Sequence, residues 1–425
     1  MEKYLERCLD SVFEQGLEDY ECILVDDCST DGSREIIEKY CRKNQDHFRY
    51  IYHTENKKLG AARNTGILAA AGKYLFFLDS DDYLMPESLK AMCDKAKETD
   101  ADNIVAFYRE VFDEAQPKCY RPLGEGDSGG DVISDPNILQ MIKYPHFAWG
   151  KLIKKNVIVD NNLFYPERIM FEDVAVGPLL VCYASTQAVS KECVCYYQRD
   201  DSISRHFSPA KVNDEIECAN MFIKECEKRN IIISDSIGNL KTQVVFAKYF
   251  LSAVYYPWCH IADDTTGDGL RLQDTIKAIV KNVYDEFVNN LFIPYIIEQD
   301  KITALNLTFD TQKQVTAIGR YLATLNNFAI WGAGKKGRDF LEKYRNYAVN
   351  CKAVIDGNVN NRGKKMPSGH GIISIDDIDD SIDTILVMNQ YHYHDIKNTI
   401  ESRGRECNLI DFERKTIDII GSLLQ

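Results

Sequence analysis

Three closely spaced aspartates, Asp79, Asp81 and Asp82, form the acidic run in this sequence with the clearest chemical use. The run follows Tyr74–Leu78 (YLFFL), a continuous apolar segment that predicts a buried strand. Because alternate side chains of an extended segment share a face, we expect Asp79 and Asp81 to bind one ligand, a Mn²⁺ or Mg²⁺ ion that holds a diphosphate. The alternative is a solvated acidic turn before the next helix, and Asp82 is expected only to order the turn.

A second acidic pair, Asp26 and Asp27, follows the apolar segment Glu21–Val25 (ECILV). Ligands of open α/β sheets gather at the carboxyl ends of the strands, so both acidic groups are expected at such ends. There Asp26 and Asp27 could accept hydrogen bonds from a base N–H or from ribose hydroxyls. The alternative is a turn that caps the next helix, a role in which Asp31 and Ser33 are also expected.

Three arginines are candidates for binding phosphate, because a guanidinium matches the geometry of a phosphate group. Arg63 lies in Gly60–Gly66 (GAARNTG), where small residues allow a close approach of the backbone to a diphosphate or a base. Close packing of a helix that carries a surface arginine would give the same pattern. Arg199 and Arg205 lie farther along the chain and could bind the departing phosphate.

A third acidic pair, Glu172 and Asp173, stands at the start of an apolar segment that predicts a helix. The functional interpretation makes Asp173 a general base that removes a proton from an acceptor hydroxyl, with Glu172 beside it in the catalytic pair. The alternative is a helix N-terminus with the acidic residues that helix dipoles favour, and no chemistry.

The glycines Gly332, Gly334 and Gly337 form a GxGxxG pattern between a predicted strand and a predicted helix, and Asp356 ends the next strand. This context is typical of a dinucleotide-binding turn, whose helix N-terminus can hold a phosphate. The alternative is that the glycines only permit the tight turn. Because the unit is small, a structural or regulatory role is favoured over a second catalytic site.

The elements that must position these residues divide the chain into three parts. Residues 1–208 alternate strand and helix patterns, which predicts an α/β fold with a mostly parallel sheet flanked by helices. Residues 209–326 are predicted to be mainly helical and carry no recognisable chemistry. Residues 327–425 return to an α/β pattern and predict a small Rossmann-like domain.

Composition narrows the class of protein. Of the 425 residues 45% are hydrophobic and 27% are charged, which is typical of a globular protein with real cores. The net charge of −14 argues against a nucleic-acid binder. The 14 cysteines include no CxxC pair, which favours reduced thiols in the cytoplasm. No apolar segment is long enough to span a membrane, although contact with a membrane surface stays open.

Taken in order, the motifs resemble those of family 2 glycosyltransferases with the GT-A fold. The first half of the chain contains, in sequence, EKYLERCLDSV, DDCSTDGS, GAARNTG, FLDSDD, AWGKL, FEDV and YYQRDDSISR. The resemblance implies a nucleotide-sugar donor, often a UDP-sugar, a Mn²⁺ or Mg²⁺ ion, and direct displacement with inversion. It implies nucleoside binding by Asp26 and Asp27, and ribose and metal contacts by Asp79 and Asp81. It also implies that Asp173 is the catalytic base.

Two further segments have counterparts in known families. Trp149 and Lys151 match a recurrent family segment that is expected to be structural or to lie on the acceptor side. Residues 327–425 resemble the small nucleotide-sugar-binding or CoA-binding-like Rossmann units attached to some sugar-modifying enzymes.

The sequence departs from the family at its beginning. Family members open with a strand of the type V-S-V-I-I-P-x-Y-N before the helix that starts here at Glu2, and no such strand follows Met1. We therefore expect the chain to be truncated at its N-terminus. Loss of this central strand would leave unpaired backbone on both of its neighbours.

Three functions are compatible with these patterns. The first is an inverting glycosyltransferase that acts on a cell-surface glycan or lipid-linked acceptor, in the cytoplasm or at the inner face of the membrane. The second is a non-catalytic nucleotide-sugar-binding or scaffold protein that has lost activity with its first strand. The third, based on the GxGxxG pattern, is an NAD-dependent oxidoreductase.

Overall fold

The structure is a computed structural model, and it describes residues 1–111, 118–120, 133–134, 146–199, 208–233, 239–297, 302, 304–388 and 393–423. The chain forms two compact units. Unit 1 comprises Met1–Gly124, Gly130–Ser236 and Val244–Phe287, and unit 2 comprises Glu125–Gly129, Ile237–Gln243 and Val288–Gln425. The expected three-part division at residues 208 and 326 stays a prediction.

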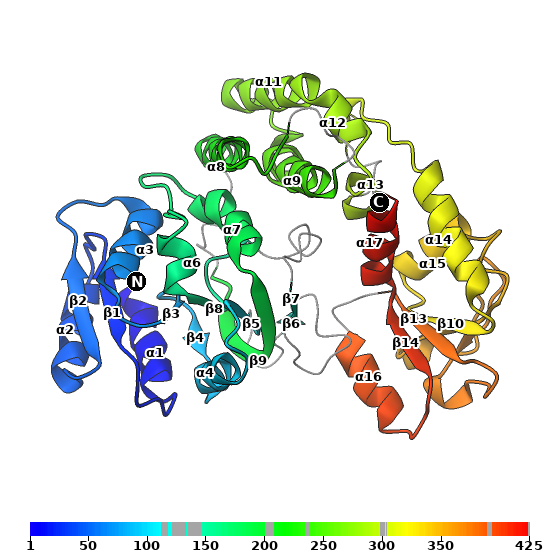
Figure 1. The fold of residues 1–425 in the computed structure, drawn as a ribbon, viewed down its shortest axis with the longest axis horizontal. Helices are drawn as coiled ribbons and strands as arrows, with labels where there is room; N and C mark the ends of the chain where they lie inside the picture. The colour runs from blue at the N-terminus through cyan, green and yellow to red at the C-terminus, as the bar shows by residue number, and fades with distance from the viewer. Residues whose placement is uncertain are drawn as a thin grey trace. The chain divides into compact units, whose positions relative to one another are not determined.

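Unit 1 begins with the alternation of helices and strands that the sequence predicts (Figure 1). Its first elements are α1 (Glu2–Phe13), β1 (Cys22–Asp26), α2 (Ser33–Lys43), β2 (Phe48–Tyr52) and α3 (Lys58–Ala69). β1 and β2 pair in parallel, and apolar residues of α1 and α2 pack on them around Phe48. Ser33 is the first residue of α2 rather than its N-cap, because Asp31 accepts the Ser33 N–H at 3.2 Å and starts the helix one residue earlier.

A seven-stranded sheet forms the rest of the α/β part of unit 1. Its strands are β3 (Tyr74–Phe76), β4 (Tyr83–Leu84), β5 (Asn103–Val111), β6 (Lys118–Tyr120), β7 (Ile133–Ser134), β8 (Lys151–Lys154) and β9 (Thr186–Tyr197). The order is β3-β8-β5-β9-β4, with β6 on β5 and β7 on β9. The parallel pairing that the sequence predicts holds for β5 with β9, whereas the other pairs of this sheet are antiparallel.

β1 and β3 each have one partner among the described strands, β2 and β8 respectively. The helices α4 (Ser88–Thr99), α6 (Lys155–Val159) and α7 (Glu172–Tyr183) complete the α/β part. Met92 of α4 is fully buried against Ile104 and Ala188 of the sheet. The expected strand before the helix that starts at Glu2 stays a prediction.

The predicted helices after residue 208 are present. They are α8 (Pro209–Lys228), α9 (Leu240–Phe250), the π-helix η1 (Leu251–Tyr255), α10 (Tyr256–Ile261), α11 (Gly267–Asn282), α12 (Tyr284–Val288) and α13 (Ile293–Ile296). α8 packs along α7, so the helical region contacts the element that begins with the third acidic pair. Ser208 caps α8 through its side chain, and Pro209 occupies the first helical position.

Unit 2 contains a five-stranded parallel sheet with the order β12-β11-β10-β13-β14. The strands are β10 (Phe328–Trp331), β11 (Cys351–Ile355), β12 (Ile372–Ile373), β13 (Thr384–Val387) and β14 (Asn408–Asp411). Apolar residues of α14 (Gln312–Thr324), α15 (Lys335–Lys343) and α17 (Phe412–Ser422) pack on one face, and those of α16 (Tyr393–Glu401) on the other. This order is that of a doubly wound sheet. Successive strands are added on one side of β10 as far as β12, and on its other side from β13 onward.

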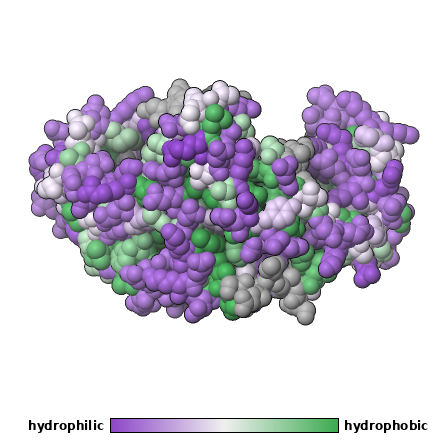
Figure 2. Space-filling model, turned by 90° about the horizontal axis from the view of Figure 1, so that it is seen from above, coloured by the Kyte–Doolittle hydropathy of each residue, from purple (hydrophilic) through white to green (hydrophobic). Residues whose placement is uncertain are grey.

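Hydrophilic residues cover most of the face drawn in Figure 2, with hydrophobic residues in smaller groups between them. Within the part of the chain that the structure describes, no helix combines the length and the apolar character needed to cross a bilayer.

Candidate active site

The acidic run after β3 is a turn rather than an extension of the strand. β3 ends at Phe76, and the Asp82 N–H donates a hydrogen bond to the Asp79 carbonyl oxygen at 3.0 Å. The expectation that Asp79 and Asp81 alternate along a strand is therefore wrong. The structure instead gives each carboxylate its own arginine: Arg63 donates to Asp79 at 3.0 Å, and Arg199 donates to Asp81 at 2.7 Å.

Asp82 fastens this turn to the end of β9. Its carboxyl group is fully buried and accepts the Tyr197 N–H at 2.8 Å. Burial, with the nearby charges of Asp79 and Asp81, raises the pKa of Asp82 to about 9. The hydrogen bond to Tyr197 joins the turn to β9, and the role expected of Asp82, to order the turn, stays a prediction.

Arg63 is the centre of the site. It is buried on α3, and its two terminal nitrogens donate to Asp79 and to Glu172. Its guanidinium carbon lies 5.5 Å from the centre of the Tyr165 ring. The alternative of a surface arginine is therefore wrong, because the acidic residues that bind Arg63 come from two different elements and enclose it.

The acidic pair at the start of α7 consists of two unlike carboxyl groups. Glu172 is buried and bound to Arg63, and burial raises its pKa to about 7. Asp173 is partly exposed and accepts no hydrogen bond, nor forms an ion pair, with another described residue. Burial also raises the pKa of Asp173, against the opposing charge of Arg63. Glu172 is thus held in place, while Asp173 is available to accept a proton.

Sequence reasoning missed several charged groups that face Asp173. Lys248 of α9 is buried near it, and burial lowers its pKa to about 8. Lys151 of β8, which the sequence predicts to be structural or to lie on the acceptor side, is buried there too, and burial lowers its pKa to about 7. Glu215 of α8 is buried too, and burial, with the charge of Asp173, raises its pKa to about 8. No sequence signal marks Glu215 or Lys248, because neither is the only charged residue of its helix and neither belongs to a recognisable motif.

The pair after β1 is already bound by its own surroundings. Asp26 is buried and accepts the Ser29 N–H at 3.1 Å and the Arg34 Nε–H at 2.7 Å. Although burial raises its pKa, these hydrogen bonds outweigh burial and hold the pKa below its usual value. Asp27 accepts the Lys57 N–H at 2.9 Å. The expected turn is present, and nucleoside binding by Asp26 and Asp27 stays a prediction.

In unit 2 the GxGxxG glycines form a tight turn between β10 and α15. Gly332 has φ +128°, and a Cβ on Gly337 would lie 1.9 Å from the Gly332 carbonyl oxygen. Asp356 accepts the N–H groups of Ala333 at 3.1 Å and Asn358 at 2.8 Å. Asp356 therefore ties this turn to the end of β11, and a ligand contact by it stays a prediction.

Two expected features cannot be placed. Arg205 and most of residues 117–131, a glycine-rich segment that the sequence predicts to be a loop, lie outside the described residues; Lys118–Tyr120 of this segment forms β6.

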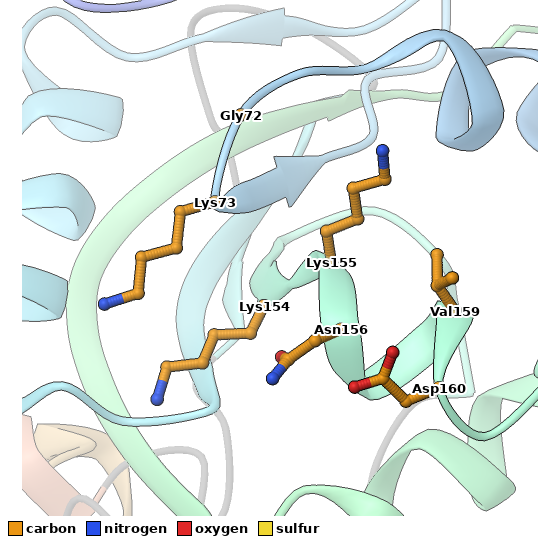
Figure 3. A pocket seen from close by; sticks show the side chains of 7 residues that line it. All are labelled: Gly72, Lys73, Lys154, Lys155, Asn156, Val159 and Asp160. Carbon is orange, nitrogen blue, oxygen red and sulfur yellow. The ribbon is translucent and has the colours of Figure 1, made fainter.

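A hollow lined by Lys73, Lys154 and Lys155 lies away from this site (Figure 3). β3 pairs with β8 so that Tyr74 is opposite Lys154, at the end of β3 farther from Asp79. Two of its ammonium groups have carboxylate partners: Lys73 pairs with Asp100 at 2.8 Å and Lys154 with Asp102 at 2.9 Å. The hollow is therefore separate from the candidate site.

The carboxylates of the acidic turn suit a divalent ion that shares its ligands with a diphosphate. The side chains of Asp79 and Asp81 are 25% and 18% exposed, and each keeps one oxygen without a hydrogen bond to another described residue. Burial and the charge of Asp79 raise the pKa of Asp81, a repulsion that a cation would relieve. No group of three or more potential ligands is present among the described residues. Mg²⁺ and Mn²⁺ sites commonly take one or two carboxylates and fill the remaining positions with phosphate oxygens and water.

Two regions of the chain match known protein families. Residues 1–127 match glycosyl transferase family 2, and residues 324–410 match the family described as C2185-like, N-terminal. The uncharacterized glycosyltransferase EpsJ of Bacillus subtilis is 32% identical over 180 residues, which are 41% of this chain and 50% of EpsJ. The poly(ribitol-phosphate) beta-glucosyltransferase of Bacillus spizizenii is 32% identical over 222 residues, 50% of this chain and 33% of that protein.

Among solved structures, S. aureus TarS residues 1–349 matches 75% of this chain and 88% of its own, with 19% identity and a TM-score of 0.51. This likeness concerns the fold. The N-terminal region of the chain is therefore a family 2 glycosyltransferase domain with a GT-A fold, as the ordered motifs predict. The chain spans about half the length of the curated relatives EpsJ and EpsH of B. subtilis.

Proposed function

We propose that the protein transfers a sugar from a nucleotide-sugar donor, a UDP-sugar, to a hydroxyl group of a cell-surface glycan or lipid-linked acceptor, with inversion at the anomeric carbon. The observation that carries the proposal is the unlike pair at the start of α7. Arg63 holds Glu172, and Asp173 stands beside it, partly exposed and without a hydrogen bond to another described residue.

In the proposed reaction an acceptor hydroxyl oxygen attacks the anomeric carbon of the donor. The bond from that carbon to the diphosphate breaks, and the nucleoside diphosphate leaves with the electron pair. Asp173 takes the proton of the hydroxyl group. Because burial raises the pKa of Asp173, its carboxylate is a stronger base than that of an exposed aspartate. The shift moves its pKa towards neutral pH.

Other residues of the site are proposed to bind the donor. Asp79 and Asp81 would hold a Mn²⁺ or Mg²⁺ ion, which supplies positive charge to the leaving diphosphate when bound. Arg199, which pairs with Asp81 at 2.7 Å, would lie beside that diphosphate. Asp26 and Asp27 would contact the nucleoside, and Arg205 the departing phosphate.

The name of the Bacillus spizizenii relative supports an anionic cell-surface polymer as one class of acceptor. Such polymers are assembled from cytosolic donors, so we place the reaction in the cytoplasm or at the inner face of the membrane. The identity of the sugar follows from no residue in the site and has to be measured.

The test begins with a thermal-shift screen of UDP-GlcNAc, UDP-glucose, UDP-galactose and their GDP counterparts, with and without Mn²⁺. UDP-GlcNAc comes first because the TarS structure was determined with it. Release of UDP from the nucleotide sugar that binds is then compared between wild type and Asp173→Asn. Release by wild type alone supports the proposal, and equal release by both proteins contradicts the role of Asp173.

Two other functions predict different results in the same assays. A non-catalytic nucleotide-sugar-binding or scaffold protein would bind the donor with Mn²⁺ and release no UDP. An oxidoreductase built on unit 2 would instead bind NAD(H), and this binding would not respond to Mn²⁺.

A further inference from the structure

The segment that leads into the acidic pair is held on one side by α3. Asn64 exchanges two hydrogen bonds with the backbone of Tyr165, at 2.8 and 2.9 Å. The Arg168 N–H donates to the Lys57 carbonyl oxygen at 2.9 Å. α3 also comes so close at Gly60 that a Cβ there would lie 2.1 Å from the carbonyl oxygen of Pro166. These contacts fix the segment to α3, the helix that carries Arg63.

The other side is held by α8, at a single residue. The Met170 N–H donates to a carboxylate oxygen of Asp214 at 3.0 Å, and the Cys218 thiol donates to the Met170 carbonyl oxygen at 3.3 Å. Because Asp214 and Cys218 are four residues apart, both side chains project from one face of α8. One helix face therefore satisfies both polar backbone groups of Met170.

The same oxygen of Asp214 also accepts a hydrogen bond from the ammonium group of Lys58, at the start of α3, over 3.2 Å. The Asp214 and Lys58 side chains are 20% and 38% exposed, so the ion pair itself adds little stability. The hydrogen bond from the Met170 N–H is the stronger restraint, because this donor is fixed in the backbone, whereas the Lys58 ammonium group stands on a long side chain that is 38% exposed.

The backbone immediately after Met170 shows why this residue has to be fixed. Phe171 has φ +61°, a left-handed conformation that costs energy for a residue with a side chain and persists only where the surroundings impose it. Glu172 and Asp173 come next. A relaxed Phe171 would turn both carboxyl groups away from Arg63 and from the acidic turn.

We propose that Asp214 is a positioning residue for the catalytic base: through its hydrogen bond to Met170 it holds the turn that aims Asp173 at the donor. The inference rests on the proposed function of Asp173. It gives the helical region, which the sequence leaves without chemistry, a direct part in the glycosyltransferase site.

Three variants separate the contacts. Asp214→Ala removes both the hydrogen bond from the Met170 N–H and the ion pair with Lys58. Asp214→Asn keeps an oxygen for the Met170 N–H, and Lys58→Met removes only the ion pair. Glu217→Ala, an exposed acidic residue of the same helix, is the matched control. Each protein is measured by hydrogen exchange of the peptide that covers residues 165–173, by calorimetric binding of UDP with Mn²⁺, and by UDP release from the nucleotide sugar that the wild type uses.

For Asp214→Ala we expect faster exchange at 165–173 and a loss of about 10- to 100-fold in kcat, as small misplacements of catalytic groups produce. Binding of UDP and the KM for the donor should stay within about twofold. Asp214→Asn should restore kcat to within about threefold of wild type, and Lys58→Met and Glu217→Ala should behave like wild type.

Unchanged exchange at 165–173 in Asp214→Ala would overturn the inference, as would equal effects of Asp214→Ala and Glu217→Ala. A loss of UDP binding that parallels the loss of kcat would also overturn it, because that pattern indicates general damage. If the wild type releases no UDP from any nucleotide sugar, the proposed function fails. The exchange measurement then still decides whether Asp214 holds the turn.

Discussion

Asp79 and Glu172 share one guanidinium, that of Arg63, although they lie at the end of a strand and at the start of a helix far apart in sequence. The sequence predicts separate roles for these residues in metal, diphosphate and acid-base chemistry. The structure joins them in one buried network. The position of the acidic turn therefore depends on the same cation as the position of the acidic pair at the start of α7.

We predict that Arg63→Met destabilises the protein by about 3 to 5 kcal/mol, because removing one partner leaves buried carboxylates without their counter-charge. Urea unfolding measures the change. Arg42→Met is the control, since Arg42 is exposed and, among the described residues, pairs only with Glu38 of its own helix. Its effect should stay below about 0.5 kcal/mol. Equal stability of Arg63→Met and wild type would show that the network adds nothing to the fold.

Asp173→Asn should keep donor binding and lower UDP release by about 10²- to 10⁴-fold, the usual contribution of a general base. Asparagine has nearly the same shape and cannot accept the proton. Glu172→Gln should behave differently: it weakens the contact with Arg63 and so reduces stability as well as rate. If Glu172→Gln retained full stability and only Asp173→Asn lost its fold, the assignment of anchor and base would be reversed.

Asp81→Ala should remove the dependence of UDP binding on Mn²⁺. The reason is that Asp81 supplies one of the two carboxylates of the acidic turn that keep an open oxygen. The measurement is a titration of UDP followed by thermal shift, with and without Mn²⁺. Asp94→Ala, an exposed aspartate of α4, should leave the Mn²⁺ effect intact. A persistent Mn²⁺ effect in Asp81→Ala would place the ion elsewhere.

Much of the fold follows from local patterns. β1 and β10 are apolar segments and β11 is apolar except for Lys352; each ends at an aspartate or a glycine turn and lies where its pattern predicts it. The family 2 domain likewise follows from motifs in a fixed order. Pairing direction was predicted less well: apolar content does not reveal that β3 and β8 run antiparallel, since that depends on how a distant segment folds back.

The candidate site also contains residues that could be predicted from the sequence and residues that could not. Asp79, Arg63 and Glu172 could be chosen from their types and settings, and the structure brings them together. Asp214 and Lys248 could not be chosen, because charged residues of a helix are usually exposed to solvent. The packing of α8 along α7 lets Asp214 bind Met170, and the fold buries Lys248 near Asp173.

In unit 2, Gly337→Ala should destabilise the protein by about 1 to 3 kcal/mol, because the new Cβ would meet a backbone oxygen that cannot move aside easily. Gly334→Ala is a matched control in the same turn. Nothing lies within 4 Å of a Cβ built on Gly334, and its φ of −71° suits any residue. Urea unfolding of both variants tests the prediction, and equal stabilities would contradict the tight turn.

The last prediction concerns Glu215, a buried carboxyl group of α8 with an oxygen that has no hydrogen-bond partner among the described residues. Burial, with the charge of Asp173, raises its pKa from 4.5 to about 8. Between these two values the unfolded chain has released the proton and the folded chain still holds it. The unfolded state therefore binds fewer protons in this window, and stability must fall as pH rises.

Glu215→Gln removes this titration, because glutamine has the shape of the protonated acid and no charge to acquire. The free energy of unfolding of the variant, relative to wild type, should therefore increase from pH 5 to pH 8 by up to about 1.4 kcal/mol for each pH unit. Chemical unfolding at pH 5, 6, 7 and 8 measures the slope. Glu217→Gln, exposed on the same helix, should leave the slope of the wild type unchanged. Parallel curves for Glu215→Gln and wild type would mean that Glu215 is ionised in the folded protein, and that an unseen partner balances its charge beside Asp173.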